Sequence, residues 1–365
     1  MQRGSASAIV RLPSWMAMSP SGSGSAPMPT MTSFSERYKL SRRTTACSRR
    51  PSAAADAGRS AHQRQNGGRM AVRRPVVILV LMLLVLPGLV LHASGKPITT
   101  MAHGPKGNVE FETLTLSGSD FWDGVKTGRP VTISGELLPA EGEGRVPAVV
   151  LSHGSGGVDR AGDLWARELR SQGVAVFVVD SFTGRGITRF PSETELSRIG
   201  QVYDVYRALA LLATHPRVDP GRIALMGRSR GGGLTLLAAR TRSLKAQAPE
   251  NLQFCAYLAF YPTVSTLVDY GPLVSRPIRL FSGTVDEAAP IAAVRDFAEK
   301  QRAAGADVKL FEYEGAHHAF DSPDFRTPAV ARIGTVSFTV HYHPQAHARV
   351  KKDVKATLAE VFAKP

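Results

Sequence analysis

Cysteine is scarce in this sequence, which has only two in 365 residues, Cys47 and Cys255. Cys47 lies in an N-terminal segment that we expect to be removed, so the processed protein would keep a single thiol. An internal disulfide is therefore excluded as a source of stability. The neighbours of Cys255, in QFCAYLAFYP, are typical of a small buried apolar position.

Acidic residues are almost absent from the first 95 residues, which hold 13 Lys and Arg residues but only Glu36 and Asp56. Residues 96–365 hold 32 basic and 28 acidic residues, so the net charge of +15 belongs mainly to the N-terminal segment. No basic stripe with interleaved aromatic residues follows it. This distribution argues against nucleic acid as a partner of the folded part.

The apolar run at residues 76–91 lacks the length of about 20 residues that a membrane-spanning helix usually needs. Arg73 and Arg74 precede it, and the small residues of Ala93-Ser94-Gly95 follow it at the spacing of a cleavage site. This order predicts a secretory signal peptide over residues 70–95 and an exported, periplasmic or secreted protein. An uncleaved segment that anchors the protein through residues 76–91 is the alternative.

Residues 1–69 lack a sustained apolar period and are rich in Ser, Ala, Pro, Gly and Arg. Such a segment cannot bury enough surface to offset its ordering entropy, so we expect a disordered leader. Because the signal peptide begins at Met70 rather than at Met1, our hypothesis is that translation starts at Met70. Residues 1–69 would then be a misassigned extension, which N-terminal sequencing of the native protein would test.

From residue 96 onward, apolar strands alternate with amphipathic helices. The predicted strands lie at residues 111–116, 131–138, 147–154, 174–182, 222–227, 257–262, 277–283 and 308–315. The predicted helices lie at residues 163–173, 195–216, 232–240, 291–305 and 347–362. The alternation predicts an α/β fold with a mostly parallel sheet and helices on both faces, formed as a single domain by residues 96–365.

The stretch RIALMGRSRGGGL places Ser229 in a G-x-S-x-G pentapeptide between a predicted strand and a predicted helix. A serine on such a turn stands clear of the sheet, and the following helix N-terminus favours a developing oxyanion. A phosphate-binding loop would need a lysine after these glycines, and none follows. A dinucleotide-binding turn would belong to the first strand–helix crossover, whereas this unit comes late. Ser229 is therefore our candidate nucleophile.

A serine hydroxyl needs a base and a group that orients the base, and in this type of fold they follow in the order acid, then histidine. The acid candidates are Asp286 and Glu287, directly after the predicted strand at 277–283, and we favour Asp286. The base candidates are His317 and His318, directly after the last predicted strand. Spacing alone does not choose between the two histidines.

An oxyanion needs two N–H donors, and one candidate is the backbone N–H of Arg230, next to the nucleophile. The second is expected from the loop His153-Gly154-Ser155-Gly156-Gly157, where either Ser155 or Gly156 could donate. We expect His153 to orient this loop rather than to react. The histidines at 341, 343 and 347 have a spacing that could hold zinc, but no cysteine or carboxylate completes a set before Asp353.

Together these features resemble the dienelactone hydrolase family of α/β-hydrolases, over residues 110–365. The motifs that carry the resemblance are VVLSHGSGG, VDSFTGRG, HPRVDPGRIALMGRSRGG, GTVDEAAP and YEGAHHAFD. In the family the catalytic histidine lies two residues before the phenylalanine, which implies His318. The resemblance also implies that Arg185 binds a substrate carboxylate.

The chain departs from dienelactone hydrolases proper at three positions. Ser229 replaces their cysteine nucleophile, Gly154 replaces the glutamate that holds the resting thiol, and Ser322 replaces a second substrate-binding arginine. We therefore expect a serine hydrolase that cleaves a small carboxylic ester or lactone through an acyl-enzyme, without a cofactor or metal. The alternatives are an acyltransferase on the same fold and a non-catalytic binding protein.

Overall fold

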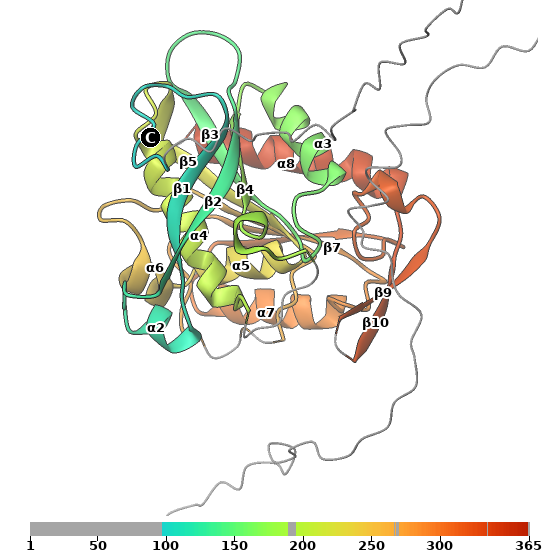
Figure 1. Cartoon of the computed structure of the whole chain (residues 1–365). Helices are drawn as coiled ribbons and strands as arrows, with labels where there is room; N and C mark the ends of the chain where they lie inside the picture. Colours follow the sequence, from blue (N-terminus) through green and yellow to red (C-terminus); the bar gives the residue numbers. More distant parts are fainter. Residues whose placement is uncertain (1–96, 189–194, 266, 268–269, 334, 364–365) are drawn as a thin grey trace, which may run out of the picture. The chain divides into compact units, whose positions relative to one another are not determined.

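The computed structural model describes residues 97–188, 195–265, 267, 270–333 and 335–363 (Figure 1). The chain divides into two units, and every described residue belongs to the second, Ser48–Pro365. The expected leader at 1–69 and signal peptide at 70–95 lie outside the described residues. Within the described part, no helix combines the length and the apolar character that crossing a membrane requires.

An eight-stranded sheet lies at the centre, in the spatial order β1-β2-β4-β3-β5-β6-β7-β8. The first two strands pair antiparallel, β2 joins β4 antiparallel, and the six strands from β4 to β8 are parallel. The strands are β1 (Gly107–Thr115), β2 (Arg129–Leu138), β3 (Val146–Ser152), β4 (Ala175–Asp180), β5 (Val218–Arg228), β6 (Tyr257–Phe260), β7 (Ile278–Gly283) and β8 (Val308–Tyr313).

Helices cover both faces of the sheet, which explains why the parallel strands are apolar throughout. In β3, Val149 and Leu151 belong to the apolar cluster that includes α3 and α8, whereas Ala148 and Val150 belong to the cluster that includes α4, α5 and α7. The helices are α2 (Gly118–Trp122), α3 (Arg160–Arg170), α4 (Arg198–Ala213), α5 (Arg230–Ala238), α6 (Thr241–Gln247), α7 (Ile291–Ala303) and α8 (Pro344–Phe362). The predicted mostly parallel sheet with helices on both faces is confirmed.

The helix starts follow from local polar residues. The Asp159 side chain accepts the Gly162 N–H and begins α3, and the Ser197 hydroxyl accepts the Gly200 N–H and begins α4. Each satisfies an N–H group that the first helical turn leaves without an internal partner. These caps fix where the chain leaves the sheet edge and enters each helix.

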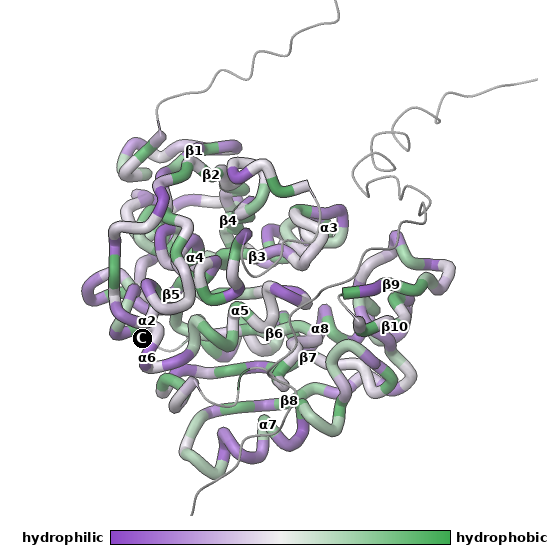
Figure 2. Tube along the Cα trace, turned by 60° about the horizontal axis from the view of Figure 1, so that its bottom comes forward, coloured by the Kyte–Doolittle hydropathy of each residue, from purple (hydrophilic) through white to green (hydrophobic). Residues whose placement is uncertain are grey.

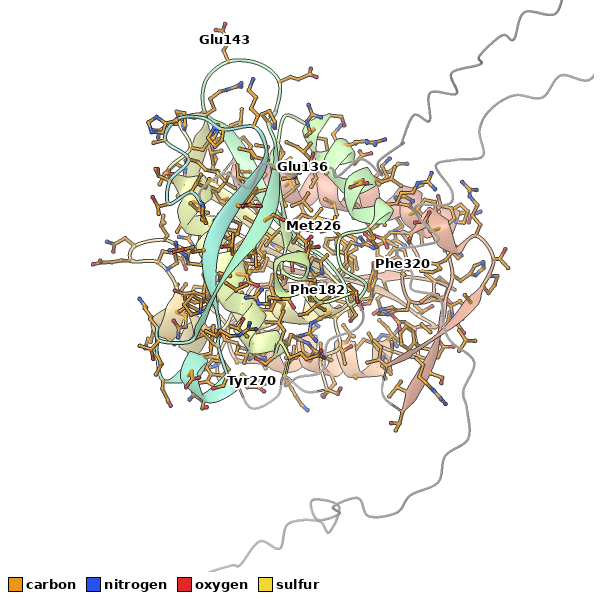
Figure 3. All side chains as sticks on the ribbon, in the orientation of Figure 1. Glu136, Glu143, Phe182, Met226, Tyr270 and Phe320 are labelled. Carbon is orange, nitrogen blue, oxygen red and sulfur yellow. The ribbon has the colours of Figure 1, made fainter. Side chains whose placement is uncertain are left out.

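Side chains sort as the hydropathy pattern predicts (Figure 3). Met226 of β5 is fully buried in the middle of the sheet, whereas Glu143 is exposed at the tip of the β2–β3 loop. Cys255 is half-buried, and its burial raises the pKa of the thiol to about 12, so the thiol stays protonated.

Three elements are absent from the sequence-based expectations, namely α2, α6 and a separate antiparallel hairpin. The hairpin consists of β9 (Ala329–Ile333) and β10 (Val336–Val340), and it lies between β8 and α8 in the chain. Figure 2 shows hydrophobic, green stretches on both of its strands. The hairpin meets the main body through a parallel bridge between Val340 and His318.

Candidate active site

Three predicted residues lie at one edge of the sheet, after the carboxyl ends of three parallel strands. Ser229 follows β5, Asp286 lies three residues after β7, and His318 lies five residues after β8. The carboxyl ends of parallel strands meet at the same edge, where ligands of open α/β sheets bind. The structure therefore brings together side chains that are up to 89 residues apart in the chain.

Ser229 lies on a strained turn between β5 and α5, with φ 54° and ψ −114°. Its N–H donates to the Phe260 carbonyl at 3.0 Å. The turn is so tight that a Cβ atom on Gly227 would lie 2.1 Å from the Gly231 carbonyl oxygen. A Cβ atom on Gly231 would lie 2.6 Å from the Ser152 carbonyl oxygen. The flanking glycines of the pentapeptide are therefore required by backbone contact.

His318 joins the serine to the carboxylate. Its Nε2 lies 2.9 Å from Ser229 Oγ, and its Nδ1 lies 2.8 Å from Asp286 Oδ2. An ionised carboxylate can only accept, so Nδ1 carries the proton and Nε2 accepts the serine O–H. The other carboxylate oxygen of Asp286 accepts the N–H groups of Ala288 and Ala289, at 2.8 and 2.9 Å. Asp286 and His318 are both buried, and Ser229 is half-buried.

Glu287 and His317, the alternative acid and base, form a second pair that does not reach Ser229. Glu287 accepts hydrogen bonds from the Thr339 N–H and hydroxyl, each at 3.2 Å. Its Oε2 also lies 3.6 Å from the His317 Nδ1. Glu287 therefore contacts the hairpin and His317, while Asp286 and His318 form the chain of hydrogen bonds that reaches Ser229.

The His318 imidazole is held between two aromatic rings. The Tyr261 ring meets it edge-on at 4.6 Å between centroids, and the Phe338 ring of β10 does so at 5.0 Å. Tyr261 is itself fixed, because its hydroxyl donates to Asp321 at 2.8 Å and accepts from Arg228 at 3.1 Å. This packing limits rotation of the imidazole and keeps both of its nitrogens aimed at their partners.

The loop after β3 passes close to the serine. It makes a turn in which the Gly157 N–H donates to the Gly154 carbonyl at 3.2 Å, with Ser155 at the second position. His153 lies 2.7 Å through Nδ1 from the Gly154 carbonyl, and its Nε2 accepts the Ser181 N–H at 3.2 Å. Burial lowers the pKa of His153, which favours the neutral ring that these two bonds require. His153 thus holds the loop in place.

Two sets of backbone N–H groups flank the serine. Arg230 is the first residue of α5, so its N–H has no acceptor within the helix. On the other side, a Cβ atom on Gly154 would lie 3.6 Å from the Ser229 Cβ, which places the loop of Ser155 beside the nucleophile. The arrangement suits an anion that forms between the helix N-terminus and the loop.

The sequence profile of the dienelactone hydrolase family matches residues 134–362. The chain belongs to the dienelactone hydrolase family. The predicted family resemblance is confirmed, and family membership makes the chain a hydrolase that acts on ester bonds.

Solved structures are similar to this family member. A protein from Klebsiella pneumoniae subsp. pneumoniae MGH 78578, provisionally named a dienelactone hydrolase, has a TM-score of 0.50 and 19% identity, covering 70% of this chain and 99% of that one. Thermogutta terrifontis esterase 2 phosphoramylated by tabun has a TM-score of 0.49 and 19% identity, covering 69% and 94%. No curated protein matches the chain significantly.

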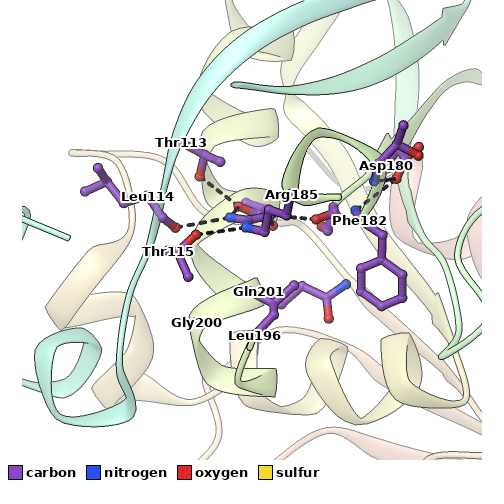
Figure 4. A network of polar contacts seen from close by, with 12 residues as sticks. Thr113, Leu114, Thr115, Asp180, Phe182, Arg185, Leu196, Gly200 and Gln201 are labelled. Atoms are coloured by element: carbon purple, nitrogen blue, oxygen red, sulfur yellow. Dashed lines mark hydrogen bonds and ion pairs between the residues drawn. The ribbon is translucent and has the colours of Figure 1, made fainter. Parts of the chain in front are cut away.

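The expectation that Arg185 binds a substrate carboxylate is wrong, because the Arg185 guanidinium binds protein groups instead (Figure 4). It donates to both carboxylate oxygens of Asp204, at 2.8 and 2.9 Å. The Arg185 side chain is only 1% exposed. The remaining donors reach the Thr115 hydroxyl and the Ser181 and Leu114 carbonyls. All five N–H donors are used, so this dienelactone hydrolase family member has no free guanidinium at position 185 for a substrate carboxylate.

The two arginines beside the nucleophile also bind protein groups. The Arg228 guanidinium donates two parallel hydrogen bonds to the Asp159 carboxylate, at 2.7 and 3.0 Å. Arg230 is buried, and its guanidinium donates to the Gln201 side chain at 2.9 Å and to the Leu196 carbonyl. Both positive charges are therefore held within the fold.

The histidines near the chain end have structural contacts. The His343 Nδ1 accepts the Ala346 N–H and begins α8, and the His347 Nδ1 lies 3.2 Å from the Tyr342 hydroxyl. His341 donates its backbone N–H to the His318 carbonyl at 3.2 Å. Among the described residues, no three His, Cys, Asp or Glu side chains are grouped so that they could hold a metal ion.

Proposed function

We propose that this protein is a serine hydrolase that cleaves a carboxylic ester of a small substrate through an acyl-enzyme intermediate. The observation that carries the proposal is the continuous chain of hydrogen bonds from Ser229 Oγ through His318 to Asp286. A nucleophile, a base and an orienting carboxylate in this order are what acyl transfer by a serine requires.

In the first half-reaction, Ser229 Oγ attacks the ester carbonyl carbon while His318 Nε2 takes the hydroxyl proton. The carbonyl oxygen becomes an oxyanion, for which the backbone N–H groups of Arg230 and Ser155 are the proposed donors. Asp286 stabilises the imidazolium that forms. The tetrahedral intermediate then collapses, the ester C–O bond breaks, and His318 returns its proton to the leaving alcohol.

In the second half-reaction, water attacks the acyl-enzyme carbonyl and His318 Nε2 takes a proton from it. The same N–H groups hold the second oxyanion. Collapse of this intermediate breaks the bond to Ser229 Oγ, which recovers the proton from His318, and the carboxylic acid leaves. The cycle consumes one water molecule for each ester that is cleaved.

Two local features support a serine rather than a cysteine mechanism. A hydroxyl does not ionise near neutral pH, so it needs a base already in contact, and His318 Nε2 lies 2.9 Å away. At position 154, where the resemblance implies a glutamate that holds a resting thiol, this chain has glycine next to Ser229. A Cβ atom at this position would lie 3.6 Å from the Ser229 Cβ, so a larger side chain there would start in contact with the serine.

The test is fluorophosphonate labelling of the full chain, measured beside turnover of p-nitrophenyl acetate. The labelled protein should be digested with chymotrypsin, because Arg228 and Arg230 flank Ser229 and trypsin would release only a dipeptide. We expect the label on Ser229 and a loss of turnover of about 10³-fold or more in Ser229→Ala. A label without turnover would favour an acyltransferase, and a folded protein that takes no label would contradict the proposal.

A further inference from the structure

Exposed apolar side chains gather on the segments that carry the candidate site. One is on the loop after β3, one lies next to Asp286, and three are on the β9–β10 hairpin. Among the described residues, the exposed large apolar side chains are Val158, Val285, Val330, Ile333 and Val336. Apolar side chains that gather on neighbouring segments, rather than scattered singly, indicate a binding surface.

The hairpin has two different faces, which its register defines. The pairs on one face are entirely apolar: Ala329 with Val340, Ala331 with Phe338, and Ile333 with Val336. The other face carries Val330 opposite Thr339 and Arg332 opposite Ser337. Because successive side chains of a strand point to opposite faces, residues of the first group share one continuous apolar face. We call it the apolar face of the hairpin.

The inner end of the apolar face covers the candidate base. The Phe338 ring lies 5.0 Å from the His318 ring, and Val340 pairs with His318 in a parallel bridge. Ala331 packs beside Phe338 in the same small apolar cluster. This end of the hairpin is therefore part of the wall around the imidazole.

The outer end of the same face extends past the imidazole and is open to solvent. Val336 lies two residues from Phe338, about 7 Å further along the strand. Val336 and its partner Ile333 keep 51% and 42% of their surface exposed. The apolar face is thus covered by protein at Phe338 and Val340, beside His318, and exposed to solvent at Ile333 and Val336.

Three arginines near the site are held by protein groups. The guanidinium groups of Arg185, Arg228 and Arg230 all bind protein acceptors. A substrate carboxylate would find none of these three cations free to pair with it. An uncharged hydrocarbon group beside the apolar face would instead remove Ile333 and Val336 from water, which is favourable in proportion to the area buried.

We propose that Ile333 and Val336 form a subsite for the hydrocarbon part of an uncharged ester, so that neutral, apolar esters are the substrate class. The proposal rests on the proposed serine hydrolase function, because it assigns a substrate to the same site. It commits to a small, dissolved ester as the occupant.

The experiment compares kcat/KM for p-nitrophenyl acetate, butyrate and octanoate, each kept below its solubility limit so that no lipid surface forms. In the wild type we expect kcat/KM to rise with chain length. In the double variant Ile333→Ser, Val336→Ser, the ratio of octanoate to acetate should fall by roughly tenfold. The matched control is Val330→Ser, which removes an apolar side chain of the opposite face of the same hairpin and should leave the ratio unchanged.

Three results would overturn the subsite. One is an equal change of both esters in the double variant, and another is the same loss of ratio in Val330→Ser, which would show that the effect is not specific to the apolar face. The third is faster turnover of a p-nitrophenyl ester with a terminal carboxylate than of its uncharged equivalent. The proposed function fails separately, if Ser229→Ala retains acetate turnover.

Discussion

Asp286 and His318 are joined at 2.8 Å, and the residues next to them, Glu287 and His317, form a second acid–histidine pair at 3.6 Å. The two pairs run side by side between the same two loops. The first pair reaches Ser229, and the second contacts Thr339 of the hairpin. Adjacent residues of the same chemical kind therefore have separable roles.

Asp286→Asn and Glu287→Gln test this separation. An asparagine can present its NH₂ group to His318, which favours the wrong tautomer, so kcat should fall by about 10³–10⁴-fold. Glu287→Gln should change kcat by only a few-fold, because Glu287 does not touch the imidazole. Steady-state turnover of p-nitrophenyl acetate measures both. Similar losses in the two variants would contradict the assignment of Asp286 as the orienting acid.

Ser155→Pro tests the proposed oxyanion donor. Proline removes the backbone N–H but suits the second position of a turn such as Gly154–Gly157, so the loop should keep its shape. We expect kcat to fall by about 10²–10³-fold, the effect of losing one oxyanion donor. Ser155→Ala, which keeps the N–H, is the control and should stay close to wild type. A fully active Ser155→Pro would transfer the role to Gly156.

Arg185→Ala tests whether Arg185 stabilises the fold rather than binding a substrate. It leaves Asp204 as an unpaired charge in the interior, so the free energy of unfolding should fall by about 3–5 kcal/mol in urea titrations. The KM of the remaining folded enzyme should barely change. Replacing both partners, as in Arg185→Met with Asp204→Leu, should recover much of the lost stability. A stable Arg185→Ala with a strongly raised KM would restore the substrate-binding role.

We expect the free energy of unfolding to depend on pH through the buried His153. Burial lowers its pKa in the folded state below the unfolded value of about 6.5, so the unfolded chain binds more protons between the two values. Its contribution is therefore complete above about pH 6.5 and is lost as the pH falls. Urea midpoints at pH 8 and pH 5 should differ more for wild type than for His153→Gln.

This comparison isolates His153 from other groups. Desolvation also lowers the pKa values of His215 and His347, which remain in both proteins and act in the same direction. Only the difference between wild type and variant therefore reports on His153. Equal shifts of the midpoint in both proteins would show that its protonation is not coupled to folding.

The sequence predicted the main sheet well but missed the hairpin that covers His318. Long apolar strands such as β3 and β7 are recognisable because helices bury them on both faces. The strands β9 and β10 are short and partly exposed, and in β10 the apolar residues alternate with polar ones. The signal was nevertheless present, since two β-branched runs are separated by only Gly334 and Thr335.

By itself the sequence determined that Ser229, an acid and a histidine would meet at one sheet edge. The physical reason is local, because alternating strands and helices make the strands parallel, and residues directly after parallel strands share an edge. The sequence also determined the turn at Ser229, because Gly227 and Gly231 leave room for backbone atoms that any Cβ atom would meet.

Only the tertiary structure decided which of two neighbouring acids faces His318, that Arg185 is buried against Asp204, and that Phe338 covers the imidazole. Hydrogen bonds act over about 3 Å and depend on direction, so a one-residue difference along a loop changes the partner completely. The groups involved come from segments far apart in the chain, and their approach depends on packing of the whole fold rather than on any local pattern.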